Sequence, residues 1–184
     1  LRGRTVRYSG WIAGASSALS LIATLALLPE LGRGGVPTLD LDWIPAARIH
    51  LILHVDWLTF PFLLIETFVT FLTVIYTWGY HHLEERSNLF YALLLLFSVG
   101  MSGTTLANDM FLFYVFWELM LIASAVLIVV WGEGANRGAV ALKYFIFTHL
   151  GSLMVLVGLI VLYNATGTAS FDALKESVTL APGM

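Results

Sequence analysis

The chain has 184 residues, of which 59% are hydrophobic and only 11% are charged, and its mean hydropathy is +0.86. This composition is typical of a protein dissolved in lipid and excludes an ordinary water-soluble domain. The net charge of -3 says little about partners, whereas the lack of cysteine excludes thiolate-held clusters, disulfides and cysteine nucleophiles within these residues.

Apolar stretches of about 20 residues recur along the chain, and each can cross a hydrocarbon core of about 30 Å as a helix. We therefore predict an all-α fold, a polytopic bundle of transmembrane helices that forms one domain over residues 1–184. The basic start lacks a small-residue cleavage site and is followed by further spans, so it is not interpreted as a signal peptide. The five predicted spans are 9–28, 57–80, 88–107, 110–131 and 139–163.

Residues 29–56 form the one long connection between predicted spans. They contain three of the five prolines, a Gly-Arg-Gly-Gly run and the acids Asp40 and Asp42, so we predict an extramembrane loop in water or at the interface. Basic residues near the span ends predict that the amino terminus is cytoplasmic. On that side lie Arg2, Arg4, Arg7, Arg86 and Arg137, and on the other side lie Arg33, Arg48 and Lys175.

Glu118 is the most informative residue, because it lies inside an otherwise apolar run, at 110–131, that is long enough to cross a bilayer. An ionisable group near the bilayer centre costs roughly 2.5–3.5 kcal/mol on insertion scales, and such groups usually face a partner or a water-filled path. We predict that Glu118 takes part in proton translocation. The alternative is a neutral carboxylic acid that donates a hydrogen bond to a neighbouring helix.

Three further polar residues inside predicted spans are candidates for the same path: Glu66, Lys143 and His149. Glu66 and Glu118 lie about 14 Å from the outer ends of their helices, and His149 lies about 16 Å in from the opposite side, so the three share the middle layer. Lys143 is shallower, about 8 Å from the cytoplasmic end, and reaches Glu118 only by extending or through His149 and water.

Each of these candidates also has a structural interpretation. Lys143 could extend its ammonium group to the headgroups, and His149 could join helices together with Thr148 and Ser152. Glu66 could be a protonated acid at a subunit contact. No catalytic or metal-binding residues are predicted, because the adjacent His81 and His82 lack the spacing of metal ligands. Asp56 and Asp109 precede spans and are predicted to cap their amino-terminal ends.

Several motifs resemble the antiporter-like membrane subunits of respiratory complex I and its relatives, most closely the M-type subunit. The segment 54–59 reads HVDWLT, and the segment 107–122 reads ANDMFLFYVFWELMLI, which is similar to the signature helix of the family. The segments 141–145, which reads ALKYF, and 162–168, which reads LYNATGT, continue the pattern. The resemblance covers roughly residues 41–175.

The resemblance implies fourteen helices in two inverted repeats, each with a broken helix, and proton transfer between two half-channels. The five spans correspond to the second to sixth helices of that fold, so the chain is expected to be an amino-terminal-region fragment. Glu118 matches the fifth-helix glutamate and Lys143 a sixth-helix lysine that is expected to hold Glu118 ionised. Two departures are Ala123, where these subunits usually place a proline, and Glu66, where no carboxylate is expected.

The function implied is a proton-translocating subunit of a redox-driven complex resembling NADH:quinone oxidoreductase. It would be a translocase subunit without its own redox centre or cofactor, and its partners would be other membrane subunits, the lipid bilayer and protons or sodium. Two alternatives are a subunit of a multisubunit sodium/proton antiporter and a non-conducting structural subunit. The expected location is a bacterial or archaeal cytoplasmic membrane, with an organelle inner membrane as the alternative.

Overall fold

A computed structural model describes residues 2–44, 49–78 and 86–179. The described chain begins with α1 (Arg2–Ala26) and the short helix α2 (Leu28–Gly32), followed by strands β1 (Thr38–Ile44) and β2 (Ile49–His54). It continues with the helices α3 (Thr59–Thr77), α4 (Ser87–Leu106), α5 (Met110–Trp131), α6 (Arg137–Thr166) and α7 (Phe171–Thr179).

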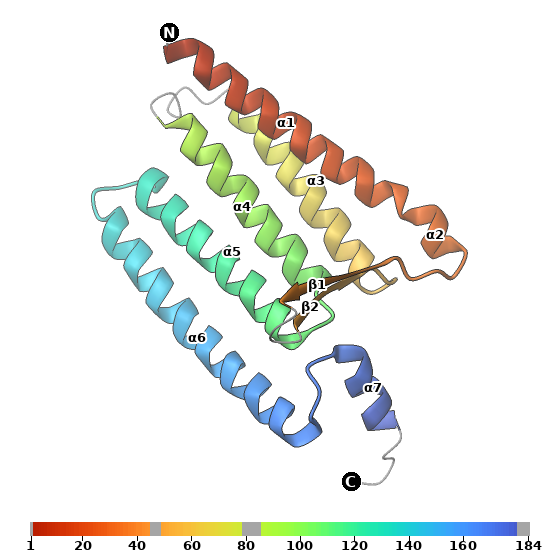
Figure 1. Ribbon diagram of the computed structural model, residues 1–184. Coiled ribbons are helices and arrows are strands. Elements are labelled where there is room, and N and C mark those ends of the chain that lie inside the picture. Colours follow the sequence, from red (N-terminus) through yellow and green to blue (C-terminus); the bar gives the residue numbers. More distant parts are fainter. Residues whose placement is uncertain (1, 45–48, 79–85, 180–184) are drawn as a thin grey trace.

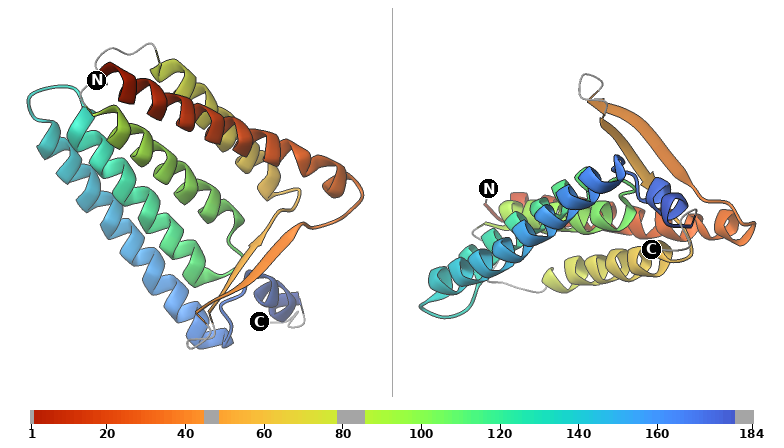
Figure 2. Two further views of the ribbon diagram at one scale, coloured as in Figure 1. Left: turned by 45° about the horizontal axis from the view of Figure 1, so that its top comes forward. Right: turned by 90° about the horizontal axis from the view of Figure 1, so that it is seen from below.

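The long helices run up and down side by side (Figure 1). Helix α1 packs against α3 and α4, α5 lies between α4 and α6, and α6 forms the outer edge. The hairpin and α7 gather at one end, away from the amino terminus, and the hairpin projects out from the helices (Figure 2). Five described helices are long and apolar enough to cross a membrane, which confirms the predicted all-α transmembrane bundle.

The observed helices are longer than some of the predicted spans. Helix α1 begins at Arg2 and not at residue 9, and α6 covers Arg137–Thr166 and not 139–163. Hydropathy detects only the part of a helix that lies in lipid, whereas backbone hydrogen bonds continue the helix into polar sequence at its ends. Most large side chains of α6 are exposed, as expected for a surface that lipid or another part of a membrane protein covers.

The predicted loop 29–56 contains a β-hairpin that the sequence analysis did not assign. Strands β1 and β2 pair antiparallel from Thr38 opposite His54 to Ile44 opposite Ile49, with an irregularity between Asp42 and Ile44. The physical reason is the alternation of polar and apolar residues in TLDLDWI and IHLILH, which gives each strand one apolar face.

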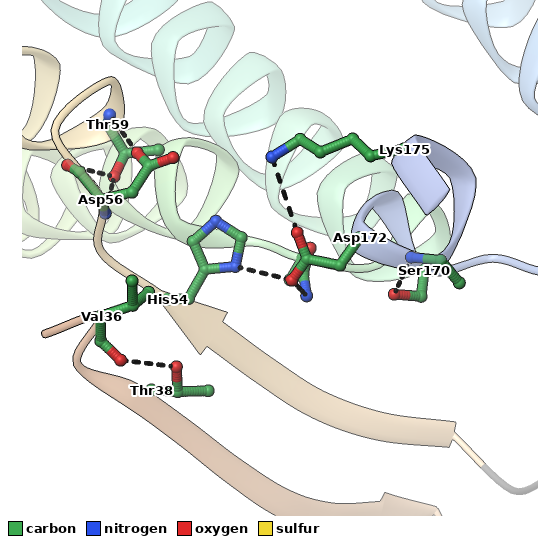
Figure 3. Close-up of polar contacts among 10 residues, drawn as sticks. Val36, Thr38, His54, Asp56, Thr59, Ser170, Asp172 and Lys175 are labelled. Carbon is green, nitrogen blue, oxygen red and sulfur yellow. Dashed lines mark hydrogen bonds and ion pairs between the residues drawn. The ribbon is translucent and has the colours of Figure 1, made fainter. Parts of the chain in front are cut away.

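The hairpin, the α4–α5 connection and α7 are joined around Asn108. The Asn108 N–H donates to the Ile52 carbonyl over 2.9 Å, and the Phe171 N–H donates to the Asn108 carbonyl over 3.1 Å. The Asn108 side chain donates to Asp172 over 2.7 Å, and Asp172 lies 3.7 Å from His54 in an ion pair (Figure 3). This network fixes the hairpin end of the bundle.

Two aspartates accept hydrogen bonds at helix starts: Asp109 is the N-cap of α5, as predicted, whereas Asp56 holds the turn that precedes α3, whose N-cap is Leu58. Asp109 accepts hydrogen bonds from the N–H groups of Phe111 and Leu112 at the start of α5. Asp56 accepts from the N–H groups of Leu58 and Thr59 before α3 (Figure 3). Burial opposes ionisation of Asp56, but its hydrogen bonds with Thr59 and Leu58 outweigh burial and lower its pKa from the ordinary value of 3.8.

Helices α4 and α5 approach closely because α4 carries glycines at the contact. A Cβ atom added to Gly100 would lie 2.8 Å from the Met120 backbone nitrogen, and one added to Gly103 would lie 2.3 Å from the Phe116 ring. Small residues allow such close approach between membrane helices. The α4–α5 contact therefore forms a tight wall in the middle of the bundle.

Candidate functional site

Glu118 lies on α5 at the seam with α6, where two side chains of α6 meet its carboxylate. The Ser152 hydroxyl donates a short hydrogen bond to Oε1 of Glu118. His149 Nδ1 lies 3.2 Å from Oε2 in an ion-pair contact, although the ring N–H is not aligned for a hydrogen bond. Ser152 is buried, and the side chains of Glu118 and His149 are 19% and 36% exposed, so the site is partly buried at the seam.

The local sequence explains how α6 presents both groups. His149 and Ser152 are three residues apart, so they lie on one helix face. The imidazole of His149 stacks on Phe145, with ring centroids 5.3 Å apart and planes 9° apart, which holds its orientation.

Lys143 does not reach Glu118. Its side chain is exposed, and it makes no ion pair within the described residues. It lies six residues from His149, about 9 Å along α6. Between them, the hydroxyls of Ser124 and Tyr144 are hydrogen-bonded over 2.9 Å across the α5–α6 seam. The predicted pairing of Glu118 with lysine is therefore replaced, in this conformation, by a contact with His149.

Glu66 forms a second and separate site between α3 and α4. Ser98 donates to Oε1 and Ser102 to Oε2, each over 2.6 Å, and Thr70 donates to Oε1 over 3.4 Å. Glu66 is 5% exposed and is thus more deeply buried than Glu118. Both carboxylate oxygens therefore have hydroxyl partners inside the bundle.

A cavity of about 310 Å³ adjoins this second site, between α1, α3 and α4. Three of its wall residues, Thr70, Ser98 and Ser102, are the hydroxyl donors to Glu66, so the carboxylate lies directly behind the cavity wall. Leu53 of β2 and Leu106 at the end of α4 also line the cavity, which therefore extends toward the hairpin end.

The structure brings Glu118 and His149 together but places Glu66 with hydroxyl groups only. Sequence analysis named Ser152 only as a possible joint between helices, and it missed Ser98 and Ser102. Their spacing of four residues in an otherwise apolar helix was the available signal, because it places both hydroxyls on one face. Of the polar residues near Glu66 in sequence, Thr67 donates instead to the Leu63 carbonyl.

No group of three or more potential metal ligands from histidine or acidic residues occurs in the part of the chain that the structure describes. His81 and His82, which lacked ligand spacing in the sequence, lie outside the described residues. Within the described spanning helices, the ionisable site chemistry is therefore that of two carboxylates, the His149 imidazole and hydroxyls.

An integral membrane protein with ionisable groups inside its spans is the class that this fold and these sites define. Two family sequence patterns match the chain. The one described as NADH:quinone oxidoreductase/Mrp antiporter, TM, matches residues 107–183, and the one described as NADH-Ubiquinone oxidoreductase (complex I), chain 5 N-terminus, matches residues 43–91. The chain belongs to this family of antiporter-like membrane subunits, which confirms the resemblance seen in its motifs.

Individual relatives agree with this assignment. The chain is 34% identical over 137 residues to the F(420)H(2) dehydrogenase subunit M of Methanosarcina mazei, covering 72% of this chain and 27% of that protein. It is 32% identical over 184 residues to NADH-quinone oxidoreductase subunit M of Escherichia coli K12, covering 91% of this chain and 36% of that protein. The chain thus spans about a third or less of the length of these relatives.

A solved structure of the Mrp complex from a Dietzia species shares the fold. The match has a TM-score of 0.74 at 24% sequence identity and covers 90% of this chain and 31% of the matched chain. The five spanning helices are therefore arranged as in the matched part of that longer chain.

Proposed function

We propose that this chain is part of a proton-translocating, antiporter-like subunit of a redox-driven membrane complex related to NADH:quinone oxidoreductase. The observation that carries the proposal is the contact of Glu118 with His149 and Ser152 across the α5–α6 seam. The family of the chain and its M-type relatives support the same function.

In the proposed mechanism, Glu118 exchanges protons with a path along α6. Ionised Glu118 is stabilised by the Ser152 hydroxyl and by His149 when the imidazole is protonated, because an opposite charge nearby favours the ionised acid. Histidine changes charge near neutral pH and can therefore relay protons. If charge movement in a neighbouring subunit separates the pair, the isolated carboxylate in a low-dielectric site favours the protonated form.

Lys143 is proposed to lie on the cytoplasmic part of this path. It lies in the amino-terminal part of α6, after Arg137, and could exchange protons with His149 through the hydroxyls of Ser124 and Tyr144 or through water. We place the amino terminus on the cytoplasmic side of a bacterial or archaeal membrane. Other membrane subunits would supply the electron-transfer cofactors, since these residues contain no cysteine to hold a cluster.

The test is cation uptake per electron in sealed vesicles that contain the assembled complex. Glu118→Gln keeps the size of the side chain but removes its ionisation, and we expect proton uptake to fall at least tenfold while assembly is preserved. Glu133→Gln, which changes an exposed acid after α5, is the matched control and should leave uptake unchanged. Unchanged uptake in Glu118→Gln would contradict the proposal and favour a structural role.

A second candidate is a subunit of a sodium/proton antiporter, because the matching family pattern includes Mrp antiporters. The same vesicles distinguish the two functions. Proton movement that requires sodium on the opposite side and continues without electron transfer would support antiport.

A further inference from the structure

A cluster of titratable side chains lies at the hairpin end of the bundle, outside both glutamate sites (Figure 3). Its centre is His54, the last residue of β2, whose side chain is only 13% exposed. The Asp172 carboxylate of α7 lies 3.7 Å from the imidazole Nδ1. Asp56, two residues after His54, also interacts with it electrostatically. A mostly buried imidazole therefore has two carboxylates as neighbours.

Asp172 receives contacts from three segments of the chain. The side-chain amide of Asn108, between α4 and α5, donates to Oδ2 over 2.7 Å, and Lys175 of α7 lies 3.6 Å from Oδ1. His54 of β2 approaches the same Oδ2 as Asn108. Near neutral pH only a histidine changes its charge, since an amide does not ionise and lysine titrates far higher. The pH dependence of this junction therefore comes from His54.

The other charged groups that face His54 are acidic. Burial raises the pKa of Asp56, but hydrogen bonds at the start of α3 and the charge of His54 more than offset burial and lower it. Asp40 of β1 is two residues from Thr38, which pairs with His54, so it lies on the same face of the hairpin. Helix α4, which also packs against β2, has no charged residue. These surroundings attract a protonated imidazole more strongly than a neutral one.

We propose that His54 is a proton-binding site that holds α7 against the hairpin in a pH-dependent manner. When the imidazole is protonated, it attracts the Asp172 carboxylate across the junction of β2 and α7. Histidine loses its proton between about pH 5 and 8, so the attraction is present in acid and is lost as the pH rises through that range. Above that range, the hydrogen bonds of Asn108 with Phe171 and Asp172 still link α7 to the bundle.

The expected movement is confined to α7. The Met110 N–H at the start of α5 donates to the Ala169 carbonyl over 2.9 Å, which fixes the connection between α6 and α7 independently of His54. The two strands also remain paired with each other from Thr38 to Ile44. The inference therefore concerns a local opening at the hairpin end, and it does not depend on the function proposed above.

The experiment measures hydrogen exchange by mass spectrometry in the assembled complex that contains the full-length subunit. Wild type and His54→Gln are compared at the same pH, so the α7 peptide has the same chemical exchange rate in both, and the ratio of rates reports the contact. At about pH 5.5 the α7 peptide should exchange roughly two- to fivefold faster in His54→Gln, as expected for a partly exposed ion pair. At about pH 8 the two rates should be nearly equal.

Two further variants test the partner and the specificity. Asp172→Asn keeps an acceptor for the Asn108 amide but removes the charge, so adding His54→Gln to it should no longer change the exchange rate of α7. His50→Gln, which changes a histidine of the same strand opposite Asp42, is the matched control and should leave α7 exchange unchanged at both pH values.

Equal exchange rates of α7 in wild type and His54→Gln at acidic pH would overturn the inference, as would a ratio that is the same at both pH values. If His54→Gln does not assemble, His54→Phe is a second neutral variant for the same comparison. Glu118→Gln should leave the exchange of α7 unchanged, so failure of the proton-path proposal would not affect this result.

Discussion

Glu66 and Glu118 lie inside the same helical bundle but have partners of different chemistry. Glu66 is held between α3 and α4 by three hydroxyl donors and is 5% exposed. Glu118 is held between α5 and α6 by one hydroxyl and an imidazole, and its side chain is 19% exposed. The partner of Glu118 can change its charge, and the partners of Glu66 cannot.

The different partners show that glutamate can have two different chemical environments within one membrane domain. A carboxylate beside an imidazole can exchange a proton with it, because both groups titrate. A carboxylate enclosed by hydroxyls has no titrating partner among its hydrogen-bond donors. The close α4–α5 contact at Gly100 and Gly103 keeps the two environments apart.

The largest expected effect concerns the stability of the two sites. A buried hydroxyl that loses its acceptor costs about 1–3 kcal/mol of stability. Glu66→Ala removes the acceptor of both Ser98 and Ser102, so it should lower the free energy of unfolding by about 2–6 kcal/mol. Glu118→Ala removes the acceptor of Ser152 alone and should lower the free energy of unfolding by about 1–3 kcal/mol. The midpoint of heat denaturation of the assembled complex measures both changes.

Removing both sides of a hydrogen bond costs less than removing one side. The triple variant Glu66→Ala/Ser98→Ala/Ser102→Ala should therefore regain part of the stability that Glu66→Ala loses. A greater loss in Glu118→Ala than in Glu66→Ala would show that the hydroxyl contacts of Glu66 contribute little.

The second prediction tests which basic residue, His149 or Lys143, is the direct partner of Glu118. His149→Phe keeps a ring that can stack on Phe145 but removes the contact with Glu118. A hydrogen bond or contact with a charged group contributes about 1.5–3 kcal/mol. Because about 1.4 kcal/mol equals a factor of ten, its loss in His149→Phe should lower proton uptake roughly tenfold or more. Lys143→Gln should have a smaller effect if His149 is the direct partner, and the reverse order in vesicle assays would assign that role to Lys143.

The third prediction concerns the wall between the two sites. A valine at Gly100 would place atoms against the Met120 backbone, which cannot move as a flexible side chain can, so Gly100→Val should destabilise by about 1–3 kcal/mol. Gly158→Val, on α6, is the matched control because a Cβ atom there meets no neighbour within 4 Å. Equal denaturation midpoints for the two variants would mean that the α4–α5 contact adjusts freely.

The spanning helices could be predicted because each is encoded by local hydropathy. The hairpin was missed although its alternating pattern in TLDLDWI was visible, since the three prolines and the glycine run of the segment 29–56 favoured a loop. Its position against the α4–α5 connection depends on contacts such as Asn108 with Ile52, which join residues distant in the chain and leave no local signal.

The candidate groups were also predictable one by one, because a charge in an apolar run stands out. Their pairing was not, since it depends on how neighbouring helices rotate about their axes. That rotation brings Ser98 and Ser102 to Glu66, and it brings His149 rather than Lys143 to Glu118. The contacts of Asp56 and Asp109 at helix starts were predictable, because each accepts hydrogen bonds from N–H groups only two and three residues ahead.

The smallest expected effect is at Asp56. This carboxylate lies at the start of a helix, outside the spanning segment, whereas Glu66 and Glu118 lie inside spans. Asp56→Ala should cost about 0.5–2 kcal/mol through loss of its hydrogen bonds at the helix start. Asp56→Asn keeps an acceptor but removes the charge, so it isolates the ionic contribution. Because the folded pKa of Asp56 is lowered from 3.8, that contribution is present above the unfolded value and is lost as the pH falls through the folded value. The denaturation midpoints of wild type and Asp56→Asn should therefore differ more at neutral pH than in acid, whereas an equal difference at both pH values would mean that the charge contributes nothing.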